Sequence, residues 1–190
     1  VLFRSKSTLL NQLAGMEKPT EGKIVIDSVD ITKLREEKMA AFRQKHIGFI
    51  FQSYNLLPYM TALENTALPL MFQGYGKKER EARAARLLKM VGLGERLSHY
   101  PSQMSGGQQQ RVGIARAFAA NPDVIFADEP TGNLDTKTTA QIMEMVLAFA
   151  RENRQTIVLV THDPEMASYA DRILTLIDGN IVKDERKDKK

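Results

Sequence analysis

The 190-residue sequence contains no cysteine. This excludes a disulfide framework and a thiolate metal site, and it is compatible with a reducing compartment. Long hydrophobic runs are also missing, because even a continuous run such as residues 157–160 (IVLV) is far shorter than the about 20 residues that a membrane-spanning helix needs. We therefore expect any association with a membrane to go through a partner protein.

Neither sign of charge dominates, since 27 basic residues face 23 acidic ones. No basic stripe interleaved with aromatic residues is present, so we expect no nucleic-acid binding. In the C-terminal run 183–190 the lysines and arginines are mixed with acidic residues, which favours a solvated tail. With 43% apolar and 26% charged residues, the composition is typical of a globular domain rather than a disordered chain.

Two nearly continuous apolar runs, at residues 124–127 and 157–160, predict parallel strands that are buried on both faces. Asp135 or Thr136 can cap a helix between them. Four apolar residues share one face of that helix: Met143, Val146, Leu147 and Ala150. A strand, a helix and a strand form a right-handed βαβ unit, in which chemistry collects at the carboxyl ends of the strands.

Shorter patterns complete an α/β domain. They predict a helix at 9–14 closed by Gly15, strands at 23–27 and 46–51, and a hairpin at 173–182 around an Asp-Gly turn. Residues 53–100 differ in texture, and the Ala-, Leu- and charge-rich stretch 77–97 within them has the spacing of an amphipathic helix. We expect 53–100 to be a helical subdomain inserted in one α/β domain that spans residues 1–190.

Polar residues follow the predicted strands. Asp128 and Glu129 come directly after 124–127, where one carboxylate can hold Mg²⁺ through water and the other can orient an attacking water. The alternative is an acidic pair that caps the next element. His162 follows 157–160 and could reach a transferring phosphate, or it could be a surface histidine of a loop. Gln52, at the end of the 46–51 strand, carries no signal alone.

Two further segments have the residue types of anion sites. Ser105-Gly106-Gly107-Gln108 precedes a helical pattern, and the two glycines let backbone N–H groups approach an anion; a Gly-rich turn that merely opens a helix is the alternative. Lys6-Ser7-Thr8 matches the end of a phosphate-binding loop, although Ser5 stands where that loop has glycine. Each alternative could account for one motif alone. Together, the alternatives do not account for the whole set of motifs in this order.

Together, these motifs resemble the ATP-binding subunit of ABC transporters over nearly the whole chain. Residues 104–111 (MSGGQQQR) resemble the family signature, with Met in place of the usual Leu. Residues 124–129 resemble its Walker B strand with the catalytic glutamate, and residues 132–135 resemble its D-loop. Gln52 and His162 stand where the family has its Q-loop glutamine and switch histidine.

The resemblance implies a P-loop NTPase (RecA-like) fold and a homodimer that sandwiches two ATP molecules. The residues implied in nucleotide binding are Lys6, Ser7, Thr8, Ser105, Gly106, Gly107, Gln108 and Asp135. Ser7, Gln52 and Asp128 would hold Mg²⁺, Glu129 would be the general base, and His162 would steady the γ-phosphate. Gln52 and the helical insertion would transmit closure of the dimer to a membrane permease at the cytoplasmic face of the membrane.

Residues 48–65 and 127–135 resemble one branch of the family, which includes the ATPases of lipoprotein-releasing, macrolide-exporting and antimicrobial-peptide-resistance systems. The implied function is an ATP-hydrolysing subunit that powers an ABC transporter of the export or extrusion type. The alternative is a cell-division type, in which the ATPase gates a membrane partner without moving a solute. DNA-repair and translation types are disfavoured, because coiled coils, Cys clusters and a second tandem cassette are not seen.

The resemblance to the family is close from Lys6 onward and fails for residues 1–5. The family has glycines within and just before residues 1–5, where Val-Leu-Phe-Arg-Ser stands here, and it has a strand and an adenine-stacking aromatic residue earlier. Side chains cannot replace glycines whose backbone N–H groups wrap phosphates. We expect an N-terminally truncated cassette with foreign residues 1–5, missing N-terminal strands, low stability and doubtful activity of its own. A natural degenerate ATPase is the alternative.

Overall fold

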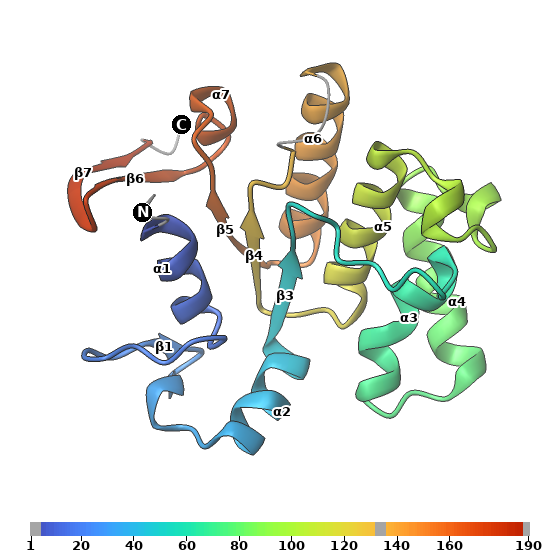
Figure 1. Cartoon of the computed structure of the whole chain (residues 1–190), viewed down its shortest axis with the longest axis horizontal. Coiled ribbons are helices and arrows are strands. Elements are labelled where there is room, and N and C mark those ends of the chain that lie inside the picture. The colour runs from blue at the N-terminus through green and yellow to red at the C-terminus, as the bar shows by residue number, and fades with distance from the viewer. Residues whose placement is uncertain (1–4, 132–135, 188–190) are drawn as a thin grey trace.

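The computed structural model describes residues 5–131 and 136–187. Its central sheet has three parallel strands in the order β3-β4-β5 (Figure 1). They are β3 (Ile47–Ile50), β4 (Val124–Asp128) and β5 (Thr156–Val160). Ile50 pairs with Ala127 and Asp128 pairs with Val160, so the carboxyl ends of all three strands lie at one edge. The three predicted strands are confirmed.

Alternate residues of β4 point to opposite faces of the sheet and into two different clusters of apolar side chains. Ile125 and Ala127 pack in the cluster that contains α5 (Gly106–Ala119) and α6 (Thr136–Glu152). Phe126 packs with Leu10 of α1 (Ser5–Leu13) in the second cluster. Because strand side chains alternate with a period of two, β4 is covered on both faces, as its continuous apolar sequence predicts.

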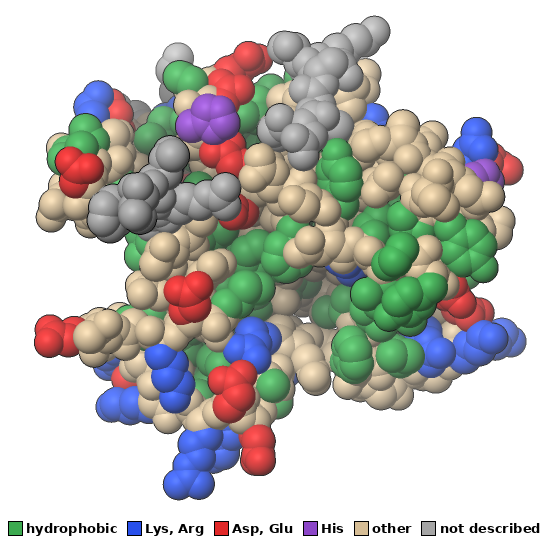
Figure 2. All heavy atoms as spheres, viewed as in Figure 1, with side chains coloured by type: hydrophobic (Ala, Val, Ile, Leu, Met, Phe, Trp, Pro, Cys, Tyr) green, Lys and Arg blue, Asp and Glu red, His purple; other side chains and the backbone are tan. Residues whose placement is uncertain are grey.

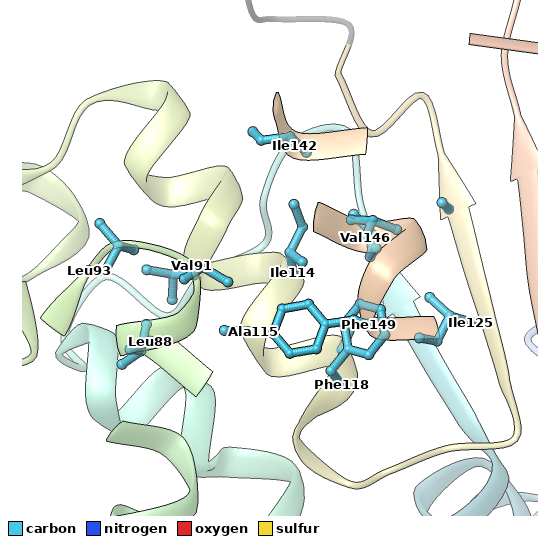
Figure 3. Packing of buried hydrophobic residues seen from close by; sticks show 14 of the residues in the cluster. Leu88, Val91, Leu93, Ile114, Ala115, Phe118, Ile125, Ile142, Val146 and Phe149 are labelled. Carbon is cyan, nitrogen blue, oxygen red and sulfur yellow. The ribbon is translucent and has the colours of Figure 1, made fainter. Parts of the chain in front are cut away.

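Helix α5 is the centre of the larger cluster, where it packs between the sheet layer and the helices α3 (Ala62–Phe72) and α4 (Lys77–Met90). The rings of Phe118 on α5 and Phe149 on α6 lie 5.2 Å apart in this core (Figure 3). The predicted amphipathic helix at 77–97 is confirmed over Lys77–Met90, with a 3-10 turn at Gly94–Arg96. The treatment of 53–100 as a separate subdomain stays a prediction.

Between α1 and β3 the chain forms elements that the sequence predicted only in part. The strand expected at 23–27 is shorter, because β1 (Val25–Ile26) turns back at once into β2 (Val29–Asp30). The two turn residues Asp27 and Ser28 have positive φ angles of 47° and 64°, as a tight hairpin turn requires. Helix α2 (Glu36–His46) was not predicted; it is strongly polar, and the apolar side chains that it buries are Met39 and Phe42.

The C-terminal part contains α7 (Pro164–Ala167) and an antiparallel hairpin of β6 (Arg172–Ile177) and β7 (Asn180–Arg186). The predicted Asp-Gly turn is confirmed. The interpretation of 183–190 as a tail is wrong for residues 183–186, which belong to β7. Their charges are of mixed sign, and the cross-strand ion pair Arg172–Asp184 at 2.7 Å stabilises this exposed strand. Residues 1–4, 132–135 and 188–190 lie outside the description.

Candidate functional site

At the edge of the sheet where the parallel strands end, three segments that are distant in the sequence lie close together (Figure 1). Lys6 and Ser7 lie in the first turn of α1, and Asp128 is the last residue of β4. Thr161 and His162 directly follow β5. The sequence predicted this arrangement, because carboxyl ends of parallel strands share one edge of a sheet.

Ser7 and Lys6 each contact one of the strand ends. The Ser7 hydroxyl donates to Asp128 Oδ1 at 3.2 Å, and the Lys6 ammonium donates to the backbone carbonyl of Thr161 at 3.3 Å. All three side chains are half-buried. A hydroxyl and a carboxylate held side by side form an oxygen donor set of the kind that Mg²⁺ prefers, next to a cation suited to phosphate.

Glu129 lies between the two residues that follow β5. Its Oε2 accepts a hydrogen bond from the Thr161 hydroxyl at 3.3 Å, and its Oε1 lies 2.7 Å from Nδ1 of His162. The Glu129 side chain is 17% exposed, whereas that of His162 is 75% exposed. One carboxylate is thus held from both sides while the histidine faces solvent. Figure 2 shows a histidine beside acidic side chains over this end of the sheet.

The backbone of Glu129 is also special. Its N–H donates to the carbonyl of Val160 at 3.0 Å, which continues the β4–β5 ladder by one residue. Its φ is +45°, in the left-handed region that non-glycine residues seldom adopt. The chain therefore turns sharply away from the sheet directly after Asp128, and the two neighbouring carboxylates separate toward different partners.

Thr161 has a larger part in the site than its sequence suggested. Its carbonyl accepts from Lys6, its hydroxyl donates to Glu129, and the same hydroxyl accepts from the N–H of Asp163 at 3.0 Å. A hydroxyl after an apolar strand gives no signal by itself. The available signal was its position between the strand and His162, at the edge where the other polar residues gather.

Gln52 lies at the same edge, two residues beyond the end of β3, and it is exposed. Thr8 is exposed on α1. Neither is among the contacts described above, so their parts in metal and nucleotide binding stay predictions. Asp135 and the other residues of the predicted D-loop, 132–134, lie outside the described residues.

The Ser-Gly-Gly-Gln segment opens α5 as the sequence predicts. The Ser105 hydroxyl accepts from the N–H of Gln108 at 3.4 Å, and the Gln108 side chain accepts from the N–H of Ser105 at 3.0 Å, which is a reciprocal capping box. Because α5 and α1 cover opposite faces of the sheet, the structure does not bring Ser105–Gln108 together with Lys6 within one chain.

A buried polar contact links α5 to residues 128–130, the turn at the end of β4 that carries Asp128 and Glu129. We call this segment the carboxylate turn. The side chain of Gln110 is 1% exposed, and its Nε2 donates to the carbonyl of Pro130, the residue after Glu129. Sequence reasoning missed this contact, because a glutamine in a polar run at a helix start is usually on the surface. Helix α5, which begins with the residues that resemble the family signature, is thus joined directly to the carboxyl edge of the sheet within one chain.

None of the helices in the described ranges is both long and apolar enough to cross a bilayer. Comparison with known proteins places the chain among ATP-binding proteins. The family model described as "ABC transporter" matches residues 5–132. An ABC transporter ATP-binding protein of Thermotoga maritima is 50% identical over 182 residues, which are 96% of this chain and 77% of that protein.

Two other relatives add detail. The macrolide export ATP-binding/permease protein MacB of Marinobacter nauticus is 48% identical over 94% of this chain, which spans 28% of that protein. The structure of the ATP-binding cassette MJ0796 of Methanocaldococcus jannaschii, a dimer in a post-hydrolysis state bound to ADP and Pi, superposes with a TM-score of 0.88. The two chains are 44% identical, and 95% of this chain and 80% of that chain are covered. This chain therefore belongs to the ABC transporter ATP-binding family, and it is an ATP-hydrolysing cassette of the kind that powers such a transporter.

Proposed function

We propose that the carboxyl edge of the sheet binds ATP with Mg²⁺ and that Glu129 is the general base for its hydrolysis. The observation that carries the proposal is the position of Glu129, held by Thr161 and His162 beside the Ser7–Asp128 pair. A half-buried carboxylate fixed in this way can orient a water molecule and accept its proton. Asp128 is then left to face the metal ion.

The donor set of Ser7 and Asp128 fits Mg²⁺, with the side-chain oxygen of Gln52 as a further ligand. The ion would supply charge stabilisation for the phosphate oxygens. Lys6 would meet the β- and γ-phosphates, and Thr8 would contribute to the same binding segment. His162 would leave its contact with Glu129 in part and steady the γ-phosphate, which its exposure permits. Such catalysis depends on positioning and charge rather than on covalent chemistry.

The complete site needs a second copy of the chain. Ser105–Gln108 and Lys6 lie on elements that cover opposite faces of the sheet, so one ATP molecule would contact Lys6 of one copy and the signature of its partner. Asp135 is proposed to lie at this interface. A related cassette forms a dimer that is bound to ADP and Pi, which supports the arrangement.

We propose that the dimer acts on a permease at the cytoplasmic face of a membrane, and that α3 and α4 within residues 53–100 form the contact region. Apolar side chains gather over these helices in Figure 2. Tyr59, Met71 and Phe72 are exposed there by 71%, 42% and 58%. MacB combines an ATP-binding part and a permease by its name. By resemblance to that branch, an exported or extruded substrate is the class proposed for this system.

The test replaces Glu129 by Gln in the full-length protein, because glutamine keeps the shape and the hydrogen-bond acceptor but cannot take a proton. We expect ATP binding to persist and turnover to fall by about 10²-fold or more. Gel filtration with ATP and Mg²⁺ should then show an accumulated dimer. Glu165→Gln, an exposed carboxyl of α7, is the matched control and should leave turnover unchanged.

The outcomes separate the parts of the proposal. Turnover of Glu129→Gln within twofold of the unaltered protein would show that Glu129 is not the base. Lost turnover with a protein that stays monomeric in ATP would contradict the shared site and leave the base in place.

A further inference from the structure

We propose that Asp27, His46 and Asp123 form a binding site for a divalent transition-metal ion such as Zn²⁺, remote from the nucleotide. One ligand atom of each residue lies within 4.8 Å of the other two. The three residues stand at the edge of the sheet where β3 and β4 begin, opposite the edge that carries Glu129. They come from three separate segments of the chain.

The backbone fixes the three positions. The N–H of Asp123 donates to the carbonyl of His46 at 3.1 Å, and the carbonyl of Asp123 accepts from the N–H of Thr156 at 3.0 Å, so the starts of all three strands are tied together. The ring of His46 stacks on Phe42 with 4.5 Å between centroids. Asp27 occupies the tight turn between β1 and β2. The fold therefore sets the backbone positions of the three ligands.

The donor chemistry suits a transition metal. One imidazole nitrogen and two carboxylates are ligands that Zn²⁺ and its neighbours accept, whereas a magnesium site rarely includes imidazole. Tetrahedral ligands at about 2.0–2.1 Å from zinc are separated by about 3.3 Å. His46 Nδ1 lies 2.5 Å from Asp123 Oδ2, so small rotations of the side chains would admit the ion between them. Two carboxylates also balance its charge.

Space for a solvent ligand is present. All three residues line an open hollow of about 860 Å³ between α2 and the α3–α4 connection. Lys45 lines the same hollow and opposes a cation there, while Glu79 and Arg83, which also line it, are paired with each other at 2.9 Å. An ion in this place would carry three protein ligands and water, which is an open coordination sphere.

A second histidine–carboxylate pair, at the carboxyl edge of the sheet where we propose that ATP binds, supplies a control for metal binding. His162 contacts Glu129 through Nδ1 at 2.7 Å, as His46 contacts Asp123, but at the other end of the strands. A strand rises about 3.3 Å per residue, and Asp123 and Glu129 are six residues apart, so the two histidine–carboxylate pairs lie about 20 Å apart along β4. Ion binding at one pair can thus be told apart from binding at the other.

The experiment titrates the purified full chain with Zn²⁺ alone, without nucleotide, by isothermal titration calorimetry. We expect one equivalent to bind, and we expect His46→Gln to weaken binding by more than tenfold, since loss even of an outer-shell partner costs about 10- to 100-fold. Asp27→Asn should weaken it by about tenfold. His162→Gln should change the dissociation constant by less than twofold.

A second measurement guards against misfolding of the His46 variant. At a fixed Zn²⁺ concentration, the melting temperature of the unaltered chain and of His162→Gln should rise by similar amounts, and that of Asp27→Asn, whose side chain is exposed in a turn, should rise by less. A dissociation constant within twofold of that of the unaltered chain in both His46→Gln and Asp27→Asn would overturn the proposal. So would the absence of saturable binding, or a loss of binding confined to His162→Gln.

Discussion

The guanidinium of Arg116 on α5 lies 2.8 Å from the backbone carbonyl of Tyr54, a residue of the segment that follows Gln52. It also donates to the carbonyl of Asn55 at 2.6 Å. Both of these residues have positive φ angles, 60° and 47°, so the segment is bent into a shape that needs outside support. Burial lowers the pKa of the Arg116 guanidinium from its ordinary value, yet the group stays charged.

We predict that Arg116→Met destabilises the fold by about 2–3 kcal/mol, because two carbonyls lose a charged donor and the strained backbone loses its support. Arg116→Lys should recover only part of the loss, since one ammonium cannot match the planar fork. Urea denaturation measures both values. Arg83→Met, which removes an exposed helical ion pair with Glu79 and a cation–π contact with Tyr75, serves as the control and should cost no more than about 1 kcal/mol. Equal losses in the Arg116 and Arg83 variants would contradict this role.

A second prediction concerns the hydrogen bond that links α5 to the carboxylate turn of residues 128–130. Gln110→Met keeps the volume but leaves the Pro130 carbonyl without its donor, so we expect a loss of about 1 kcal/mol. Gln110→Glu places a buried carboxylate against that carbonyl oxygen, and the loss should be several-fold larger. Thermal denaturation at neutral pH ranks the two variants. A ranking in which Met is the worse substitution would refute the hydrogen bond.

The cap of α5 gives a third prediction, in which stability and turnover separate. Ser105→Ala removes the acceptor for the N–H of Gln108 and should cost about 1 kcal/mol. Ser105→Asp caps a helix as well as serine does and should keep that stability. If an ATP phosphate of the partner copy meets this turn, the added negative charge of aspartate should nevertheless lower the ATPase rate. Full activity of the Asp variant would argue against such a contact.

The charged hairpin allows a prediction on pH. The hydrogen bond and charge of Arg172 hold the pKa of the Asp184 carboxyl below its usual range. A carboxyl with a depressed pKa stabilises the folded hairpin above its unfolded pKa of about 3.9, and this contribution is lost as the pH falls through the folded value. Arg172→Met should move the pKa of Asp184 up toward its usual range in an NMR titration. Arg186→Met should move it less, because that residue acts only through charge.

The sequence was most informative where a strand is buried on both faces and functional side chains come directly after it. The apolar runs at 124–127 and 157–160 placed Asp128, Glu129 and His162 at one edge, and the structure brings Glu129 and His162 into contact. Ser105 was likewise found from its capping pattern. In each case a local rule and the tertiary packing agree, which is why the pattern alone was enough.

The parts that sequence reasoning missed depend on partners far along the chain. Gln110, Arg116 and Thr161 act through backbone carbonyls or carboxylates whose positions only the fold determines. Helix α2 was missed because its polar sequence buries little apolar surface, and the end of β7 was missed because its charges resemble those of a solvated tail. The pattern of a single sequence indicates which face of a helix or strand is apolar. It does not indicate which distant backbone or side-chain group a polar residue will contact.

The two-sided packing of β4 has a consequence for the precision of the site. Phe126 fills the α1 side, whereas the small Ala127 meets the α5–α6 side. A slip of one residue would drive the large ring into the space made for a methyl group and would shift both carboxylates by about 3.3 Å. The placement of Asp128 and Glu129 is therefore enforced by the unequal sizes of two apolar neighbours that never touch a ligand.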